Sequence, residues 1–560
     1  MFRINRQCGL FVISAAIYAA FSSPLMAKDI IHDAEYSVIE AQNREAWQAD
    51  NKQVDQKLKD FRNKNGGKAP NIVYILLDDV GFGEIGMPDM AVTRGYKTPN
   101  MDKLANAGMS LQRMYTEPSC TPTRVAMMTG RLPGRTGLNE AKTTLSGEGL
   151  AAEEVTLAEV LKEAGYQTSH IGKWHMGDIE QAWAQNQGFD HAEFPIHQQA
   201  QLALMHAEAE QSDITRSIGT DGSYPKTFTL DNTFSGVGGD MLTGVEARNG
   251  KLYEVGIKAG EKWSQKKYHE MNVRYQKSAL EQIGKMAKND KPFYLNYWPL
   301  YPVTFARNDS GEFKTLNGGS FTEAIVQVDD WIGEIMEELK TQGVADNTIV
   351  VVMGDNGTMV QYMGLSGASD RVYRGGKGQH LEGGVRVNAF VSWPGMIEAG
   401  SMAEDIMHVS DFYTSFARLA GATDKIPRDR VIDGVDQTGV LLLGETHGRR
   451  DYIFNYEQSM LKSVVKNKFK MHLPGAGKNP IIDAGFYDLY RDPREERPID
   501  SIKLGTWAAG SFGAMIKRHM GLKQKYPDRK PTYGPVYGGV ENIRPETQRL
   551  VDAFNAGKKK

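Results

Sequence analysis

The chain has 560 residues, two cysteines and a formal net charge of −3 at pH 7. Its content of 40% hydrophobic and 24% charged residues is ordinary for a soluble globular protein, and its length predicts more than one domain. The nearly balanced charge argues against a general binder of nucleic acid or of anionic membranes.

Residues 1–27 have the pattern of a secretory signal peptide. Arg3 and Arg6 precede an apolar run over 9–21, and Ala27 ends a suitable cleavage site. This run is too short to span a membrane, and no later stretch reaches about 18 apolar residues. We therefore expect an exported protein, periplasmic or secreted, without membrane attachment after cleavage; a membrane anchor is the less favoured alternative.

Residues 28–64 are predicted to form an N-terminal helical arm. Apolar residues recur at helical intervals between Ile39 and Phe61, and the glycines and proline of 66–70 end the pattern. We interpret the arm as an amphipathic helix that packs on the main body. A solvated or oligomerising helix is the alternative.

The run 71–77 is continuously apolar after its first residue, which is typical of a strand buried on both faces of a parallel sheet. Asp78 and Asp79 follow it, at the edge of the sheet where α/β proteins bind ligands. Adjacent carboxylates repel each other, and a cation between them is the simplest reason to have both. A solvated loop is the alternative.

Cys120 opens the motif Cys-Thr-Pro-Thr-Arg, which continues to Thr-Gly-Arg at 129–131. A proline in the first turn and a glycine at 130 predict a helix between them. The unpaired N–H groups of a helix N-terminus suit an oxyanion, and Arg124 adds a positive charge about one turn later. Because Cys8 lies in the signal peptide, Cys120 is the odd thiol of the exported chain. A buried core cysteine is the alternative.

The rest of the chain alternates between predicted helices and strands. Helices are expected at 98–105, 156–164, 266–288 and 321–340, and strands at 167–171, 291–298 and 348–353. Asp355 and Asn356 follow the last of these strands and complete an oxygen-rich site with Asp78 and Asp79, which favours calcium over zinc. The long segment 194–263 is interpreted as an insertion that shapes access to the substrate.

These motifs together resemble the formylglycine-dependent type I sulfatases of the alkaline phosphatase superfamily. The resemblance runs with gaps from about Asn71 to Asp492. It includes Gly-Lys-Trp-His-Met-Gly at 172–177, Gly-Gly-Lys-Gly at 375–378 and Glu-Gly-Gly-Val-Arg-Val at 382–387. Thr123 departs from the Ser or Ala that is usual in the cysteine motif.

The resemblance implies an α/β sandwich of the alkaline-phosphatase type, with a large mixed, mostly parallel sheet. It also implies a smaller C-terminal α+β domain with an antiparallel sheet, and we expect strands there at 451–456 and 462–473 and a covering helix at 507–523. The expected units are a signal peptide (1–27), the arm (28–64), a catalytic domain (65–440) with its insertion, and a C-terminal subdomain (441–560).

The resemblance also implies the chemistry. A maturation enzyme would oxidise Cys120 to formylglycine, whose hydrate attacks the sulfur of an aryl or carbohydrate sulfate ester. The resemblance implies that one calcium binds to Asp78, Asp79, Asp355 and Asn356. It also implies that Arg124 and Lys173 balance the charge of the hydrate, while Lys377 and His175 hold the sulfate and assist proton transfer.

The sequence departs from the family after the strand at 291–298. Most sulfatases place Pro-His there, and the histidine contacts the sulfate, whereas this chain has Pro302-Val303. Lys377 is the candidate to neutralise the leaving oxygen in its place, with a pKa lowered by cation neighbours and desolvation. His197 and His380 are weaker candidates.

Two other functions are alternatives. A phosphonate monoester or phosphodiester hydrolase would use the same nucleophile, and a sulfated-glycan-binding protein would have lost catalysis. The natural substrate, the oligomeric state and the identity of the maturation enzyme stay open at this point.

Overall fold

The computed structural model describes residues 29–142, 146–195, 244–302 (without 249, 257 and 262–264), 320–358, 372–473, 485–499 and 502–557. The predicted signal peptide, most of the predicted insertion, His197 and Val303 lie outside these ranges. Among the described residues, no helix is both long and apolar enough to cross a membrane.

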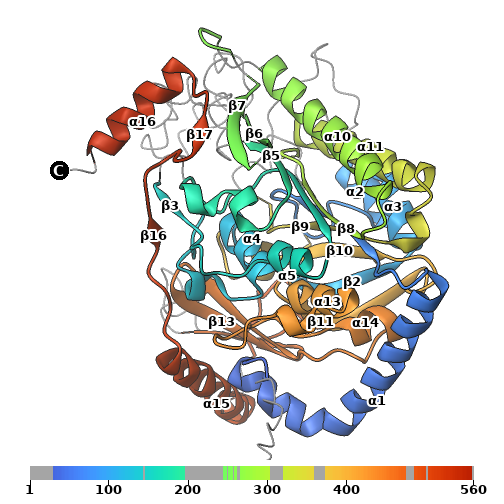
Figure 1. The fold of residues 1–560 in the computed structure, drawn as a ribbon. Coiled ribbons are helices and arrows are strands. Elements are labelled where there is room, and N and C mark those ends of the chain that lie inside the picture. Colours follow the sequence, from blue (N-terminus) through green and yellow to red (C-terminus); the bar gives the residue numbers. More distant parts are fainter. Residues whose placement is uncertain are drawn as a thin grey trace, which may run out of the picture.

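A large sheet of 11 strands crosses the molecule (Figure 1). Its five central strands are parallel, in the order β9 (Thr348–Gly354), β1 (Asn71–Leu77), β8 (Phe293–Trp298), β4 (Gln167–Gly172) and β5 (His191–Pro195). Next to β9 lie the antiparallel β10 (Arg386–Ser392), then β2 (Met109–Tyr115) and β11 (Ser401–His408). The predicted mixed, mostly parallel sheet is therefore confirmed.

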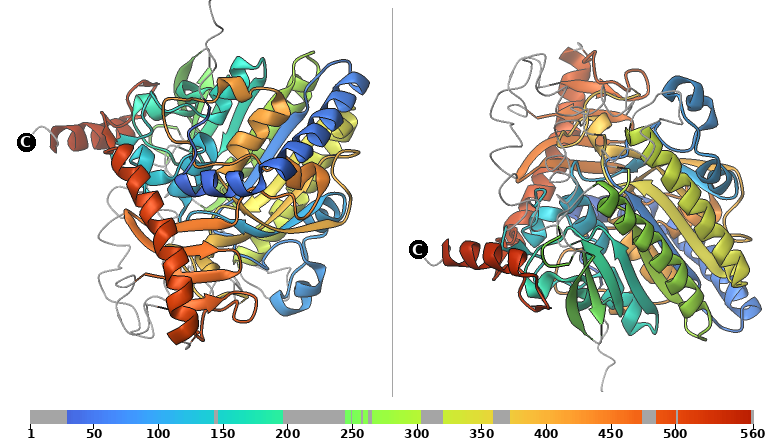
Figure 2. Two further views of the ribbon diagram at one scale, coloured as in Figure 1. Left: turned by 90° about the horizontal axis from the view of Figure 1, so that it is seen from below. Right: turned by 90° about the horizontal axis from the view of Figure 1, so that it is seen from above.

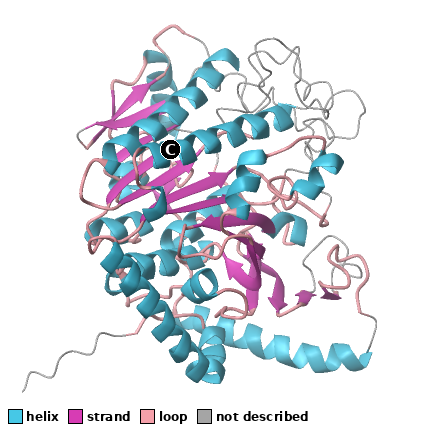
Figure 3. Ribbon diagram, turned by 90° about the vertical axis from the view of Figure 1, so that its right-hand side faces the viewer, coloured by secondary structure: helices cyan, strands magenta, loops and turns pink. Residues whose placement is uncertain are grey.

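The central strand β1 is buried on both faces, as its continuous apolar run predicts. Ile72, Tyr74 and Leu76 belong to one hydrophobic core, whereas the alternate residues Val73 and Ile75 belong to the other. Helices cover both faces of the sheet (Figure 3). On the first face lie α1 (Ala34–Lys64), α4 (Cys120–Thr129), α5 (Leu157–Glu163), α13 (Asp411–Ala420) and α14 (Thr438–Leu443); on the second lie α3 (Pro99–Asn106), α10 (Gln265–Ala287) and α11 (Ser320–Thr341). Two one-turn helices, α2 (Ala91–Arg94) and α12 (Glu382–Val385), lie in connections.

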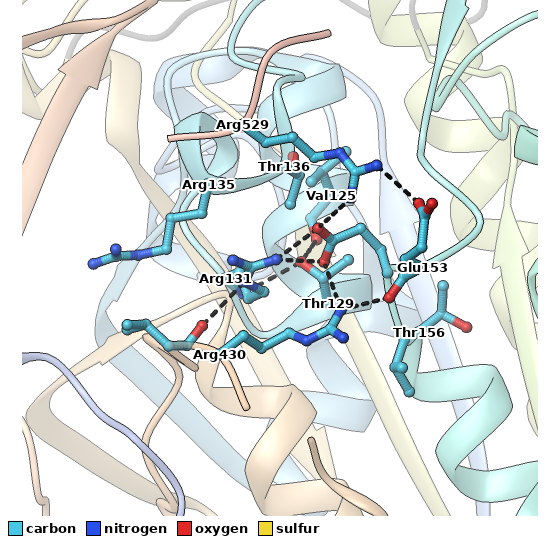
Figure 4. Close-up of polar contacts among 12 residues, drawn as sticks. Val125, Thr129, Arg131, Arg135, Thr136, Glu153, Thr156, Arg430 and Arg529 are labelled. Carbon is cyan, nitrogen blue, oxygen red and sulfur yellow. Dashed lines mark hydrogen bonds and ion pairs between the residues drawn. The ribbon is translucent and has the colours of Figure 1, made fainter. Parts of the chain in front are cut away.

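Helix α4 is the helix predicted from the cysteine motif. It begins at Cys120 and ends before Gly130, whose φ of 67° is the left-handed C-cap conformation. Arg131, two residues after the end of α4, contacts Glu154 at 2.6 Å. Nearby, Arg529 contacts Glu153 at 2.8 Å (Figure 4). The contact of Arg131 ties the chain just after α4 to the segment that precedes α5.

A small antiparallel sheet follows in the chain. Its strands, in order, are β12 (Tyr452–Glu457), β13 (Met460–Lys466), β14 (Phe469–His472) and β15 (Phe486–Asp488). The single strand expected at 462–473 is wrong, because the chain turns at Asn467, whose φ of 51° is left-handed, and forms two strands. Helix α15 (Ile502–Lys525) packs Phe512 and Met515 in one core cluster with this sheet (Figure 2, left).

The chain then returns to the large sheet. β16 (Thr532–Tyr533) pairs with β3 (Glu148–Gly149), β17 (Val540–Glu541) joins the far edge of the large sheet, and α16 (Pro545–Gly557) follows. At that edge, β6 (Gly244–Arg248) and β7 (Lys251–Val255) form a hairpin within the predicted insertion. The segment 441–560 thus contributes to the small sheet, to the large sheet and to the separate two-stranded sheet of β16 and β3, a result of long-range pairing that local sequence does not contain.

The N-terminal arm packs on the body. Helix α1 begins after Asp33, whose side chain accepts a hydrogen bond from the Glu35 N–H at 3.0 Å. Val54 and Leu58 are 0% and 5% exposed and belong to the core of the first face. The interpretation as a packed amphipathic helix is confirmed over the solvated alternative.

This packing predicts a measurable effect on stability. Leu58→Ala should lower the free energy of unfolding by about 2–5 kcal/mol, because it leaves a cavity between α1 and the body. Lys59→Ala, at the exposed neighbouring position, should change it by no more than about 0.5 kcal/mol. Urea unfolding of both variants measures this, and equal unfolding midpoints would show that α1 does not contribute to the core.

Candidate active site

Polar side chains from four elements meet at the carboxyl ends of the parallel strands. Asp78 and Asp79 follow β1, Asp355 follows β9, and Lys173 follows β4. Because these strands are parallel neighbours or nearly so, their ends share one edge of the sheet. The N-terminus of α4 brings Cys120 to the same place.

Cys120 is completely buried in this cluster. Its Sγ lies 3.3 Å from Asp78 Oδ1, 3.4 Å from Asp79 Oδ1 and 3.0 Å from Lys377 Nζ. Burial, followed by the carboxylates of Asp355, Asp78 and Asp79, raises the pKa of the thiol well above its usual value. The residue therefore carries a neutral thiol in this environment, and the alternative of a purely apolar core cysteine does not fit its neighbours.

Arg124 contacts several members of the cluster. Its Nη2 lies 2.9 Å from Asp355 Oδ2 and 3.5 Å from Asp78 Oδ1, and its Nη1 donates to the Lys173 carbonyl at 3.1 Å. The guanidinium also lies over the Trp298 ring, 4.9 Å from its centroid. These contacts hold Arg124 in one orientation in a fully buried place.

Hydrogen bonds of the backbone and of Asn356 hold the acidic residues next to one another. The Asp355 N–H donates to the Leu77 carbonyl, and the Asp79 N–H donates to Asp355 Oδ1, both at 2.9 Å. Asn356 donates its side-chain N–H to Asp79 Oδ1 at 2.8 Å. Asp79 adopts a left-handed φ of 54°, a conformation that aspartate tolerates better than most residues and that often marks functional sites.

The charges of the cluster compensate one another. Burial opposes ionisation of Asp78, but Lys173, whose Nζ lies 2.5 Å from its Oδ1, Lys377 and Arg124 hold its pKa well below the usual range. Burial and the neighbouring Asp78 carboxylate instead raise the pKa of Asp355. Because these carboxylates lie so close together, they repel one another, and nearby positive charge is needed to keep them ionised.

The donors fit a hard divalent cation. Ligand atoms of Asp78, Asp79, Cys120 and Asp355 all lie within 4.8 Å of one another. Asp78 Oδ2 and Asn356 Oδ1 are buried without a hydrogen-bond partner among the described residues. Buried oxygens rarely lack partners, and carboxylate and amide oxygens are the ligands that calcium prefers.

His175 lies two residues beyond Lys173, and its φ is a left-handed 59°. Its Nε2 is 2.9 Å from the Lys142 carbonyl, and its Nδ1 has no partner among the described residues. Burial, followed by the charge of Lys173, lowers the pKa of His175 well below its usual value. A neutral imidazole with one uncommitted nitrogen is able to accept or pass on a proton.

Lys377 lies opposite β1 in a loop rich in glycine. Its Nζ is 2.7 Å from Asp79 Oδ1, and its side chain is 14% exposed, whereas those of Arg124 and Lys173 are completely buried. Burial alone would lower its pKa, but Asp79 raises it well above the usual value. The predicted lowering of the Lys377 pKa is therefore wrong, because the carboxylate outweighs desolvation.

Glycines allow this loop to approach the site. A Cβ on Gly357 would lie 1.7 Å from the Gly383 carbonyl oxygen, and one on Gly384 would lie 2.1 Å from that of Gln379. The loop is fixed by backbone hydrogen bonds from Lys377 to Thr358 at 3.0 Å and from Gly378 to Pro118 at 2.6 Å.

A buried ionic cluster joins the loop to the small sheet. Lys470, on β14, is completely buried, with its Nζ 3.0 Å from both Glu382 Oε1 and Glu495 Oε1 and 2.7 Å from the His380 carbonyl oxygen. His472 contacts Glu495 at 2.7 Å. The small sheet thus supports the loop that carries Lys377.

The structure brings all the predicted site residues to one edge of the sheet, with His175 at its border. Sequence reasoning missed Trp298, Glu84 and Thr358, which hold Arg124 and the loops in place. The sequence pattern indicated Trp298 only as the last residue of a strand. His380 is bound to Glu457 at 2.6 Å, which favours a structural role, and His197 and Val303 lie outside the described residues.

Comparisons with known proteins agree with this geometry. A family model described as Sulfatase matches residues 70–422. N-acetylgalactosamine-6-sulfatase of Mus musculus is 30% identical over 418 residues, 72% of this chain and 72% of that protein. Arylsulfatase A of Homo sapiens is 30% identical over 499 residues, 84% of this chain and 90% of that protein.

The fold has solved counterparts. The crystal structure of PsFucS1 sulfatase from Pseudoalteromonas sp. is similar with a TM-score of 0.73 and 27% identity, covering 86% of this chain and 96% of that one. Sequence and fold agree over most of the chain, and the match includes the cluster around Cys120. The chain therefore belongs to the sulfatase family of the alkaline phosphatase superfamily, and it is an enzyme that hydrolyses sulfate esters.

Proposed function

We propose that the enzyme acts through a formylglycine made from Cys120, together with one calcium ion on Asp78, Asp79, Asp355 and Asn356. The observation that carries this proposal is the position of Cys120 Sγ, which lies between two carboxylates and the Lys377 ammonium at the start of a helix. When present, the formylglycine hydrate supplies a hydroxyl nucleophile and calcium supplies positive charge to a sulfate oxygen.

The side chains of the protein do the remaining work. Arg124 and Lys173 are fixed cations near position 120. Because their side chains are already held in place, they stabilise negative charge there without moving. Lys377, the most exposed of the three cations, faces the incoming ester and binds its sulfate. His175 stays neutral, and its free Nδ1 accepts a hydrogen bond and so assists proton transfer.

The partners and location follow from the same proposal. A maturation enzyme that makes formylglycine would act on the motif at 120–124 during export, as the basic and apolar leader at 1–27 suggests. The substrate is a sulfate ester of a sugar or a phenol. A panel of sulfated sugars, aryl sulfates and phosphate diesters tests this assignment; faster release of phosphate than of sulfate would favour the phosphonate or phosphodiester hydrolase.

Formylglycine predicts a specific covalent change. In active protein, the peptide that contains Cys120 should have the mass of an aldehyde or its hydrate, and Cys120→Ala should abolish turnover because it removes the nucleophile. Peptide mass spectrometry together with a sulfate-release assay measures both. Full activity with only unmodified cysteine would overturn the mechanism.

The acidic cluster predicts dependence on calcium. Asp355→Ala should weaken calcium binding by at least about 100-fold and remove activity, because it deletes a charged ligand and the closest carboxylate partner of Arg124. Asp346→Ala, at an exposed position, serves as the control. Isothermal titration of chelated protein measures the affinity directly; restoration of activity by zinc alone would contradict the assignment.

Lys377 predicts an effect that depends on the leaving group. Its ammonium stabilises charge on the departing oxygen, so Lys377→Ala should reduce kcat/KM for alkyl and sugar sulfates about 10²- to 10⁴-fold, and much less for sulfates of acidic phenols. The exposed Lys340→Ala is the control. Measuring kcat/KM of the variant and the wild type across a series of leaving groups tests this. An equal loss of kcat/KM for every leaving group would show that Lys377 only binds the sulfate.

A further inference from the structure

A cavity of about 420 Å³ lies beside the reactive cluster. Pro118, Ser119 and Pro122, which surround Cys120 in the chain, form part of its wall, together with Gly378, the neighbour of Lys377. Its volume is in the range of small-ligand sites. A substrate whose sulfate reaches Cys120 would therefore place the rest of its structure in or next to this cavity.

The small sheet forms the opposite wall. The turn between β12 and β13 contributes Gln458 and Ser459, and the end of α15 contributes Lys523. Gln458 donates a hydrogen bond to Glu140 Oε2 at 3.1 Å, which connects this turn to the segment after α4. The cavity thus lies between the segment around Cys120 and the small sheet, and Gln458, Ser459 and Lys523 give its far wall polar side chains.

Acidic groups dominate the lining. Among the described residues, the carboxylates of Glu140, Glu457 and Asp528 face the single ammonium of Lys523. That ammonium is already held by Asp528 at 2.7 Å and lies 4.5 Å from the centroid of the Tyr456 ring. No cation of the described lining is therefore available to a second anionic group on the substrate.

One buried group points to a hydroxylated ligand. Glu117 lines the cavity, is 2% exposed, and its Oε1 lacks a hydrogen-bond partner among the described residues. Burial, followed by the charge of Asp433, raises the pKa of Glu117 to about 8. Its carboxyl is thus protonated at neutral pH and can both donate to and accept from a hydroxyl group.

We propose that this cavity binds the alcohol part of the substrate and selects an uncharged sugar with a single sulfate over sugars that carry further sulfate or carboxylate groups. The proposal rests on the sulfatase activity proposed above. Carboxylates, side-chain amides and the Ser459 hydroxyl hydrogen-bond well to sugar hydroxyls. A second anion, in contrast, would meet carboxylates whose cation partners are already engaged: Lys523 contacts Asp528 at 2.7 Å, His380 contacts Glu457 at 2.6 Å, and Lys142 lies 3.5 Å from Glu140. The added anion would have to compete with these carboxylates, and juxtaposed like charges disfavour binding.

The test compares matched substrates. We would measure kcat/KM for a monosulfated neutral disaccharide, for the same disaccharide with a second sulfate on the other ring, and for 4-nitrophenyl sulfate. The wild-type enzyme should prefer the monosulfated sugar by at least about tenfold, since removing or adding one unit charge a few ångströms away has an effect of this order.

Two variants test the origin of that preference. Asp528→Asn releases Lys523 from its carboxylate, and Ser459→Lys adds a cation to an exposed turn that tolerates substitution. Each should raise the ratio of kcat/KM for the disulfated over the monosulfated sugar about three- to tenfold. Asp552→Asn makes the same charge change as Asp528→Asn at an exposed position on α16 and should leave the ratio unchanged.

The possible results distinguish a failure of the cavity proposal from a failure of the sulfatase mechanism. The cavity proposal is overturned if the enzyme hydrolyses 4-nitrophenyl sulfate but has equal kcat/KM for the two disaccharides. It is also overturned if neither Asp528→Asn nor Ser459→Lys changes the ratio of kcat/KM between the two disaccharides. In both cases the sulfatase mechanism still holds. Absence of sulfate release from all three substrates by fully matured enzyme overturns both. A preference for the monosulfated sugar that both variants reduce supports the proposal.

Discussion

Charge compensation around Cys120 is the constraint on which the rest of the site depends. Three carboxylates and three cations meet in a space where almost every side chain is buried. An unpaired buried charge costs several kcal/mol, on the order of that measured when one partner of a buried ion pair is removed. Each group is therefore tolerated only because the others are in place, and among the described residues Asp78 Oδ2 and Asn356 Oδ1 still lack hydrogen-bond partners.

The fold supplies this arrangement through the direction of its strands. β1, β9 and β4 are parallel, so the residues that follow them arrive at one edge of the sheet. Helix α4 enters the same edge with its N-terminus, where free N–H groups favour negative charge. Just after its far end, Arg131 contacts Glu154, which ties the chain there to the segment before α5.

The small sheet does more than cover one end of the molecule. Through Lys470 and Glu495 it holds the loop that carries Lys377, and through the turn at 458–459 it bounds the cavity beside the nucleophile. One unit thus fixes a charged residue of the site and lines the space for the leaving group. A change in this sheet can alter substrate preference without touching the residues at the sheet edge.

The sequence by itself determined the parts that depend on local pattern. Continuous apolar runs predicted β1 and β9, because strands buried on both faces need apolar side chains at every position, and Asp78 and Asp355 could be placed at their ends. Proline after Cys120 and glycine at 130 predicted α4 because both residues restrict the backbone locally.

Only the tertiary structure decided what depends on distant neighbours. The edge strands β6, β7 and β17 join the large sheet through pairings between remote segments, and short strands have too little pattern to reveal their partners. The raised pKa of Lys377 follows from its distance to Asp79, and Lys470 is buried because two glutamates from elsewhere in the chain surround it. Charge, burial and cavity shape are properties of three-dimensional neighbourhoods, and spacing along the chain does not specify them.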